Sequence, residues 1–369
     1  MKARVRKVLE ALSPSPDALL IANSVDPHID QSFYYFLDVP SGLFERAVEI
    51  GLPDGRLHVL TSQLEEETAR QAARHDPSVE VTMVADREAQ DRELAKLLPK
   101  SGTFGLNFHE LTHETYLALG KALPGATFVD ASASIKKARM IKDAVEIERL
   151  ERAGSIGSKV ALEIPKMLRR GMTELELAAQ IEQHMMALGA SSSSFKTIVG
   201  FGPNSAEPHY FAGERRLEPG VSMVCDFGAY YRRYASDITR SFHFGPTDEE
   251  LKRVHETVES AQQAALAVVR AGVPAKEVHL AAAKVINASP WKGKFTHGLG
   301  HSIGLAVHDG FSMNHTVEEP LEAGLAVTVE PGIYLPGHGG VRIEDDILVT
   351  ETGYRFLTTA PRSYLEVPA

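Results

Sequence analysis

The sequence contains a single cysteine, Cys225, so no disulfide can form within the chain. It has no run approaching the roughly 20 consecutive apolar residues that a membrane-spanning helix needs. The first residues also lack the uninterrupted apolar core of a signal peptide, because Lys7, Glu10 and Pro14 break it. These absences predict a protein of the reducing cytoplasm that has no membrane partner.

Positive charge is also scarce in this sequence. Asp and Glu number 49 and Lys and Arg number 39, which gives a formal net charge of −10 at pH 7. A nucleic-acid surface needs clustered Lys and Arg, so the excess of acidic residues argues against a nucleic-acid partner. No glycine-rich phosphate-binding fingerprint follows a candidate strand in the N-terminal third, so no nucleotide site is expected there.

The composition, 43% hydrophobic and 24% charged, is that of a globular protein with sizeable cores. Strand-like and helix-like segments alternate in the N-terminal third, which predicts an α/β domain. The expected strands are residues 18–22, 33–37, 47–50, 57–60, 79–84, 102–106 and 127–129. The expected helices are residues 3–12, 64–74, 87–98 and 110–122.

A change in composition at Ala131-Ser-Ala-Ser places a domain boundary near residue 132. We therefore expect residues 1–132 to form the α/β domain and residues 133–369 to form a second domain. Helical patterns in the second domain, one of them opened by a capping box at Thr173, occur with strands that are mostly antiparallel. This pattern predicts an α+β domain.

The stretch from residue 225 to residue 240 carries two carboxylates, Asp226 and Asp237, between segments that favour β-structure. Residues 221–225 are apolar and residues 238–244 alternate, so two antiparallel strands joined by a tyrosine-rich turn are expected. If both carboxylates point to one face, they repel each other unless a proton or a cation lies between them.

Further polar residues in the C-terminal part could supply the other ligands of such a cation. They lie in His297-Gly-Leu-Gly-His301, Glu330-Pro-Gly and Arg342-Ile-Glu344. A lone carboxylate in such a place is most often a solvent-facing strand residue. Four carboxylates and one imidazole, however, would balance two divalent cations and a bridging hydroxide. Such oxygen-rich coordination suits Mn²⁺, with Co²⁺, Fe²⁺ or Zn²⁺ as alternatives.

These blocks, in their order, resemble the metal-dependent pita-bread peptidases of family M24, which include methionine aminopeptidase, aminopeptidase P and Xaa-Pro dipeptidase (prolidase). The matching blocks are Asp226-Phe-Gly, Ser236-Asp237-Ile-Thr-Arg240, His297-Gly-Leu-Gly-His301-Ser-Ile-Gly304, Val307-His308-Asp309, Val329-Glu330-Pro-Gly-Ile-Tyr and Val341-Arg-Ile-Glu344-Asp. The segment Arg139-Met-Ile-Lys-Asp-Ala-Val-Glu-Ile is similar to the proline-directed branch. The resemblance covers nearly the whole chain, and implies a creatinase/prolidase-type α/β N-terminal domain followed by an α+β pita-bread catalytic domain.

The resemblance also implies a role for individual residues. The implied metal ligands are Asp226, Asp237, His301, Glu330 and Glu344. His209 and His308 would act in catalysis with Glu330, which would carry a proton from the nucleophile to the proline nitrogen. Thr239 and Arg342 would support the site, Arg342 by orienting a ligand carboxylate or the substrate terminus, with a simple ion pair as the alternative. Two divalent metal ions per subunit and a homodimer are implied as well.

The implied activity is metal-dependent hydrolysis of small peptides that carry proline at the second position. We interpret the chain as an Xaa-Pro dipeptidase that uses a hydroxide bridging two metal ions. Aminopeptidase P, acting on Xaa-Pro-Xaa peptides, is the alternative, because typical prolidases carry an arginine four residues after the histidine matching His308, where this chain has Ser312. A creatinase or a non-peptidase binding protein of the same fold would have lost ligands, and all five ligand positions are present here.

Overall fold

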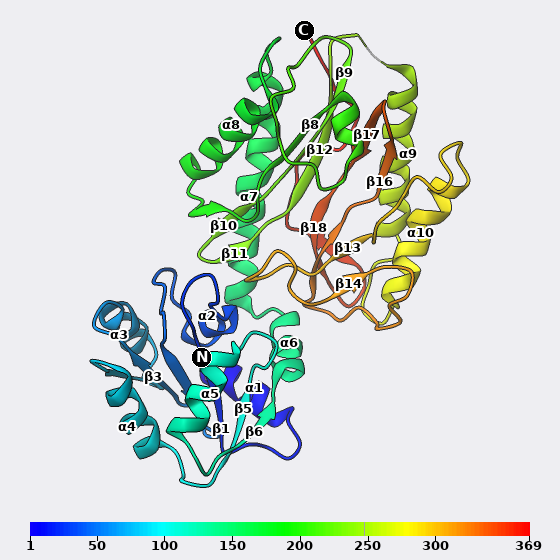
Figure 1. Ribbon diagram of the computed structural model, residues 1–369. Helices are drawn as coiled ribbons and strands as arrows, with labels where there is room; N and C mark the ends of the chain where they lie inside the picture. Colours follow the sequence, from blue (N-terminus) through cyan, green and yellow to red (C-terminus); the bar gives the residue numbers. More distant parts are fainter. Residues whose placement is uncertain (247) are drawn as a thin grey trace. The chain divides into compact units, whose positions relative to one another are not determined.

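The computed structural model describes residues 1–246 and 248–369. Its contacts divide the chain into two compact units, Met1–Arg139 and Met140–Ala369 (Figure 1). The boundary expected near residue 132 is instead the first residue of helix α6 (Ser132–Met140). This helix stays with the first unit because Lys7 Nζ and Tyr35 Oη donate hydrogen bonds to the Ala138 carbonyl at 2.8 and 3.2 Å.

The first unit is built around one six-stranded sheet with the order β4-β3-β2-β1-β5-β6. The β1–β5, β5–β6 and β3–β4 pairs are parallel, and β2 is antiparallel to both of its neighbours. The strands are β1 (Ala18–Ala22), β2 (Val48–Gly51), β3 (Leu57–Thr61), β4 (Val79–Met83), β5 (Thr103–Leu106) and β6 (Thr127–Asp130). The remaining helices are α1 (Lys2–Glu10), α2 (Gln31–Leu37), α3 (Glu66–His75), α4 (Arg87–Leu97) and α5 (His113–Ala122).

Helix α2 corrects one prediction, because residues 33–37 were expected to form a strand. A short, continuous apolar run is compatible with a buried strand and with a buried helix, so periodicity alone does not distinguish them. The residue before the helix decides the outcome: Asp30 caps it by accepting a hydrogen bond from the Ser32 amide at 2.7 Å. The Asp30 side chain is itself held by Asn107, whose Nδ2 donates to it at 2.7 Å.

The second unit consists of small, mostly antiparallel sheets between two pairs of helices. Its strands are β7 (Ser192–Ser193), β8 (Ile198–Phe201), β9 (Val221–Phe227), β10 (Ala229–Tyr231), β11 (Tyr234–Ala235), β12 (Ile238–Phe244), β13 (Gly300–His301), β14 (Ser312–Met313), β15 (Ala326–Val329), β16 (Gly332–Leu335), β17 (Gly339–Arg342), β18 (Asp345–Val349), β19 (Tyr354–Phe356) and β20 (Glu366–Val367). Its helices are α7 (Ala144–Met167), α8 (Glu174–Ala187), the 3₁₀ helix η1 (Gly202–Ala206), α9 (Glu249–Leu266) and α10 (Ala275–Asn287). No described helix is long and apolar enough to cross a membrane.

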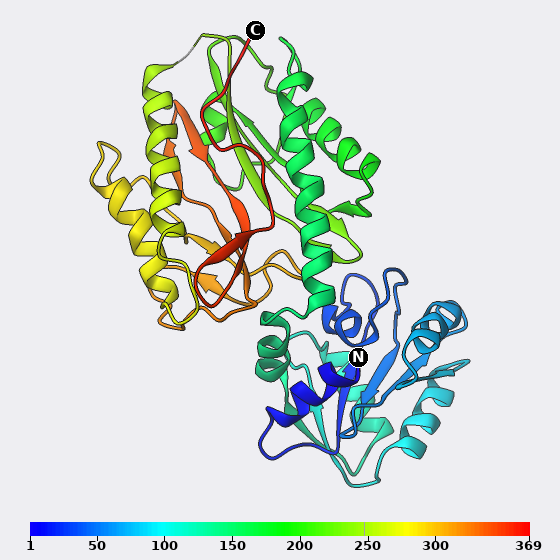
Figure 2. The same ribbon diagram turned by 180° about the vertical axis from the view of Figure 1, so that it is seen from behind.

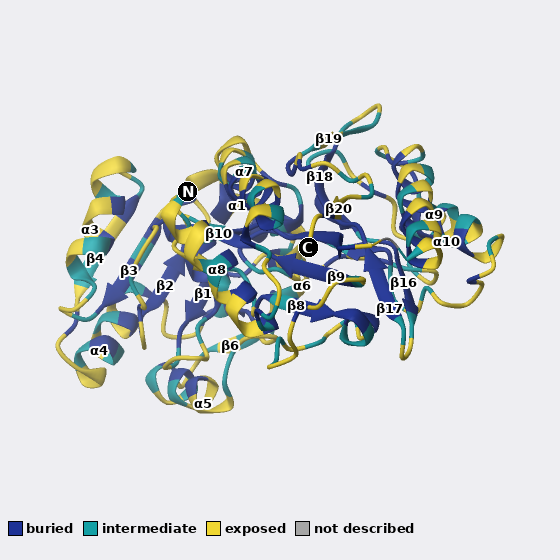
Figure 3. Cartoon of the chain, turned by 90° about the horizontal axis from the view of Figure 1, so that it is seen from above, coloured by how far each residue is buried: buried dark blue, intermediate teal, exposed yellow. Residues whose placement is uncertain are grey.

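Two separate cores divide this unit into halves. In the first half, α7 and α8 pack on β8, β9 and β12, and in the second half α9 and α10 pack on β15 to β18. Figures 1 and 2 show the two helix pairs flanking the strands, with the red C-terminal segment running between them. Figure 3 shows most of these strands buried, whereas the helices have exposed outer faces. The two helix pairs therefore shield the polar residues of these strands from solvent on both sides.

The central hairpin forms as predicted, with β9 and β12 paired antiparallel so that Thr239 lies opposite Asp226. Side chains alternate between the two faces of a strand, so Asp237 and Thr239 point to the same face, and Asp226 shares it. Cys225 points the other way and is fully buried in the core of the first half. The register of one hairpin thus brings the two aspartates together.

Candidate metal centre

The four carboxylates and the one imidazole predicted as metal ligands line a single pocket of about 400 Å³ in the second unit. Asp226 and Asp237 come from the first half. His301 lies on β13, Glu330 directly follows β15, and Glu344 lies between β17 and β18 in the second half. Ligand atoms of Asp237, His301 and Glu344 all lie within 4.8 Å of one another. His301 Nε2 is 3.7 Å from Asp237 Oδ2 and 3.6 Å from Glu330 Oε1.

The carboxylates of this pocket are buried close together, which is unfavourable for their charged forms. Burial, followed by the repulsion of neighbouring carboxylates, raises the pKa of Asp237 and Glu344 well above the ordinary range. Burial raises the pKa of Glu330 to about 8. Among the described residues, Asp226 Oδ1 and Asp237 Oδ1 find no hydrogen-bond donor although both are buried. Buried acceptors without donors are what cations require, so this donor set fits divalent metal ions.

Two polar side chains hold the carboxylates from the side. Arg342 donates from Nη2 to Asp226 Oδ2 at 2.6 Å and from Nε to Thr239 Oγ1 at 3.1 Å. The Thr239 hydroxyl in turn donates to Glu344 Oε2 at 2.6 Å. Arg342 also reaches Tyr334 Oη at 2.9 Å, so its guanidinium is engaged by protein groups. Arg342 is therefore the ion-pair partner of Asp226, and it also lines the pocket.

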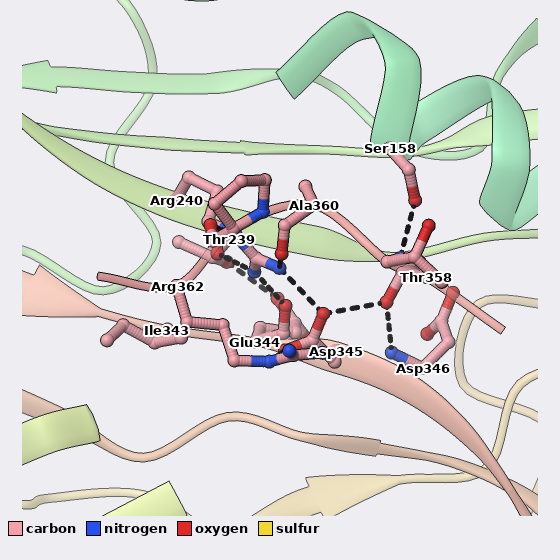
Figure 4. Close-up of polar contacts among 12 residues, drawn as sticks. Ser158, Thr239, Arg240, Ile343, Glu344, Asp345, Asp346, Thr358, Ala360 and Arg362 are labelled. Atoms are coloured by element: carbon pink, nitrogen blue, oxygen red, sulfur yellow. Dashed lines mark hydrogen bonds and ion pairs between the residues drawn. The ribbon is translucent and has the colours of Figure 1, made fainter. Parts of the chain in front are cut away.

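A further network lies behind Glu344 (Figure 4). Arg240 donates to the Glu344 carbonyl at 2.6 Å, to Asp345 Oδ1 at 2.7 Å and to the Ala360 carbonyl at 2.7 Å. Arg362 Nε donates to the other Asp345 oxygen at 2.6 Å. These contacts fix the backbone on either side of Glu344. Arg240 and Asp345 stand in the matching blocks, but no role was predicted for them because their partners in residues 358–362 are remote along the chain.

Asp346 supports the second aspartate of the hairpin. Its Oδ2 accepts a hydrogen bond from the Asp237 amide at 2.8 Å, and its own amide donates to Thr358 Oγ1 at 3.0 Å. Three consecutive acidic residues therefore have different roles. Glu344 lines the pocket, Asp345 binds Arg240, and Asp346 accepts a hydrogen bond from the Asp237 amide. Sequence reasoning recognised only the first of them, although three successive acids inside a strand pattern are a signal that could have been followed.

The two histidines predicted to act in catalysis line the same pocket as the carboxylates. The ring of His308 lies 4.0 Å from that of His301, measured between centroids. Burial lowers the pKa of His308, and it lowers the pKa of His301 to about 4, so both rings are neutral at pH 7. A neutral imidazole can offer one nitrogen to a metal or one N–H to a substrate oxygen. His297 bonds instead to Tyr334 Oη at 2.9 Å, as a residue that supports its loop.

The loop that carries His209 is held by Glu174, which sequence reasoning passed over. The expected capping box of Thr173 and Glu176 is present at the start of α8. Glu174, one residue into the helix, is fully buried and accepts four hydrogen bonds. The donors are Phe201 N, Asn204 Nδ2, Tyr210 Oη and Gly213 N, at 2.8 to 3.0 Å. Tyr210 directly follows His209, so this carboxylate fixes the segment that places His209 in the pocket.

Part of the remaining pocket wall is apolar. It includes Phe195, Ile198, Val307 and Met313. Phe195, Ile198 and Met313 lie outside the matching blocks, so the sequence did not reveal them, whereas Val307 belongs to the block Val307-His308-Asp309. They leave an apolar surface beside the carboxylates, suited to a nonpolar part of a ligand.

Comparisons with known proteins agree with this geometry. A model of metallopeptidase family M24 matches residues 148–351, and a model of the creatinase/prolidase N-terminal domain matches residues 2–141. The uncharacterized peptidase YqhT of Bacillus subtilis is 37% identical over 261 residues, which are 71% of this chain and 74% of that protein.

Two solved structures extend the likeness to almost the full length. The X-Pro aminopeptidase from Thermotoga maritima is 34% identical, has a TM-score of 0.89, and is matched over 95% of this chain and 98% of its own. The Xaa-Pro dipeptidase from Bacillus anthracis is 32% identical, with a TM-score of 0.88, over 99% and 98% of the two chains. The predicted fold, a creatinase-type domain followed by a pita-bread catalytic domain, is confirmed.

Replacing Thr239 with valine is expected to weaken cation binding by about 10- to 100-fold, the range for residues that orient metal ligands. The substitution keeps the shape of the side chain and removes the hydroxyl that donates to Glu344. Calorimetric titration of chelator-stripped protein with Mn²⁺ measures the affinity. Thr239→Ser, which keeps the hydroxyl, is the matched control. Equal affinities for the valine variant and the wild type would show that the hydroxyl does not position Glu344.

Chelator-stripped protein is expected to lose thermal stability as the pH rises from about 5 to about 8. With the pKa of Glu330 raised to about 8 and those of Asp237 and Glu344 raised as well, the folded state holds protons that the unfolded chain has released. Bound Mn²⁺ replaces these protons, so it should raise the melting temperature more at about pH 8 than at about pH 5. Scanning calorimetry with chelator and with Mn²⁺ tests this. A stripped protein that becomes more stable over this range would contradict it.

Proposed function

This chain belongs to metallopeptidase family M24, and we propose that it is an Xaa-Pro dipeptidase, which hydrolyses the bond between an N-terminal residue and a following proline. One observation carries the proposal: all five side chains predicted as metal ligands line one pocket, together with His209 and His308. A binding protein that had abandoned catalysis would have no reason to keep so many buried carboxylates together, because their mutual repulsion destabilises the fold.

The residues that would hold metal ions are Asp226, Asp237, His301, Glu330 and Glu344. Four carboxylates and one imidazole suit two divalent cations, and we propose Mn²⁺ as the physiological metal because the donors are mostly oxygen. When bound, such cations lower the pKa of a coordinated water molecule and polarise the substrate carbonyl.

The protein's own residues would then handle the charge and the proton. His308 and His209 are proposed to donate hydrogen bonds to the oxygen on which negative charge develops. Glu330 is proposed to take the proton released by the attacking water and to deliver it to the proline nitrogen, which must be protonated to leave.

Proline explains why this pocket needs no acceptor for the amide of the scissile bond. A bond before proline has no N–H, so proteases that hold their substrates by that donor bind it poorly. Here the pocket offers an apolar wall that includes Phe195, Ile198 and Val307. We propose that the pyrrolidine ring lies against this wall.

Aminopeptidase P remains the second candidate, because of the residues that follow His308. Asp309 is buried, and Ser312 lines the pocket at the position where typical prolidases carry an arginine. A serine offers no positive charge to the carboxylate of a dipeptide. It also leaves room for a longer peptide to leave the pocket.

The experiment that tests the proposal compares an Xaa-Pro dipeptide with an Xaa-Pro-Xaa tripeptide. Chelator-stripped protein is assayed on both, with and without added Mn²⁺. We expect hydrolysis that depends on metal and is faster for the dipeptide. Faster cleavage of the tripeptide would identify an aminopeptidase P instead. If neither peptide is cleaved while metal is bound, the proposed function is wrong.

Two substitutions should separate metal binding from catalysis. Asp237→Asn is expected to lose bound metal and activity together, because it removes a ligand charge. His209→Ala is expected to keep the metal but to lower kcat by about 100- to 1,000-fold, the usual effect of removing an oxyanion donor. Metal content is measured by atomic emission on the purified variants.

Asp54→Asn, on an exposed ion pair with Arg56, is the control and should match the wild type. Metal loss in His209→Ala would mean that His209 is a ligand. Full activity in Asp237→Asn would contradict the assignment of Asp237.

A further inference from the structure

A buried ion pair joins the start of the catalytic unit to the loop that carries His308. Lys142 Nζ lies 3.0 Å from Asp309 Oδ2, and the two side chains are 0% and 5% exposed. Lys142 belongs to the segment Arg139-Met-Ile-Lys-Asp, which matched the proline-directed branch but has no role in the proposed chemistry. Its backbone is fixed, because its amide donates to the Gly324 carbonyl at 3.0 Å.

Stability alone does not account for this pair. Removing an ammonium and a carboxylate from water costs several kcal/mol per ion, and their attraction offsets that cost only about evenly. An apolar pair of similar volume would pack there at least as well. A buried ion pair does, however, favour one arrangement of its two partners, since displacing them weakens a strong attraction in the protein interior.

The hydrogen bonds of the surrounding loop connect the position of Asp309 to the position of His308. The Asp309 amide donates to the Ser302 carbonyl at 2.8 Å, and the Phe311 amide donates to Ser302 Oγ at 2.9 Å. Asp309 points into the protein, whereas the adjacent His308 lines the pocket. A carboxylate held at Asp309 therefore limits where the backbone of His308 can lie.

Gly304 provides independent support for the importance of this pair. A β-carbon at Gly304 would overlap Asp309 Oδ2 and would come within 2.8 Å of Lys142 Nζ. Any side chain at that position would thus displace the ion pair. The glycine that ends the block His301-Ser-Ile-Gly304 is explained by the space that the pair occupies.

We propose that Lys142 is a positioning residue for His308: by anchoring Asp309, it holds the imidazole of the preceding residue against the pocket. The inference rests on the proposed function, because it assigns His308 the role of hydrogen-bond donor to the substrate. Lys142 itself does not touch the pocket and is not a catalytic residue.

The test is a double-mutant cycle between Lys142→Met and His308→Ala, with kcat and KM measured on the better of the two peptides. Lys142→Met alone should lower kcat by about 10- to 100-fold, the effect of misplacing a catalytic group, with KM little changed and bound metal equal to the wild type. In the His308→Ala background the same change should lower kcat by less than about 2-fold, because the group it positions is already absent. Equal losses in both backgrounds would overturn the proposal.

Further variants and a second readout guard against misfolding and against failure of the assay. Lys142→Arg keeps the charge and should retain more of kcat than Lys142→Met. If Lys142→Met does not fold, Lys142→Met combined with Asp309→Asn removes both charges and should fold while still losing kcat. Lys166→Met, on an exposed pair with Glu163, is the matched control and should behave as the wild type.

Hydrogen exchange followed by mass spectrometry tests the positioning without any substrate. Lys142→Met should speed exchange in residues 302–312 and leave β9 and β12 unchanged. Unchanged exchange in residues 302–312 would contradict the proposal even if the wild type cleaves neither peptide. An inactive wild type with faster exchange in the variant would instead overturn only the proposed function.

Discussion

Repulsion between buried carboxylates is the constraint on which the catalytic unit depends. Asp226, Asp237, Glu330 and Glu344 share one pocket, and their charges can coexist there only with protons or cations between them. The fold must therefore force these groups together against their own electrostatics. The register of one hairpin does so for Asp226 and Asp237, whereas Glu330 and Glu344 lie directly beside the ends of strands in the second half.

Positive and polar groups hold the carboxylates of the pocket in position. Arg342 and Thr239 hold Asp226 and Glu344 laterally, and Arg240 holds the Glu344 backbone from behind. Among the described residues none donates to Asp226 Oδ1 or to Asp237 Oδ1, so these oxygens stay available to cations. Because two ligands come from one half of the unit and three from the other, bound cations would also connect two separate cores.

The sequence predicted the features that depend on residues close together in the chain. The alternation around Asp226 and Asp237 predicted their hairpin, and the blocks around His301, Glu330 and Glu344 predicted their common site. Residues 33–37 were predicted as a strand but form a helix that Asp30 caps. The composition change near residue 132 was predicted as a domain boundary but marks the start of helix α6. Glu174, Lys142 and Arg240 could not be assigned because each acts on residues that are distant along the chain, and only the fold brings them into contact.

The hydrogen-bond network behind Glu344 has a consequence for the stage of synthesis at which the metal site can form. Thr358, Ala360 and Arg362 follow every proposed ligand in the sequence, yet they fix Asp346, Arg240 and Asp345. During synthesis, the ribosome releases all the carboxylates before it releases the residues that hold them in place. The site is therefore completed only after residues 358–362 have been synthesised, and a nascent chain stalled before residue 358 would have the ligands without the groups that hold them in position.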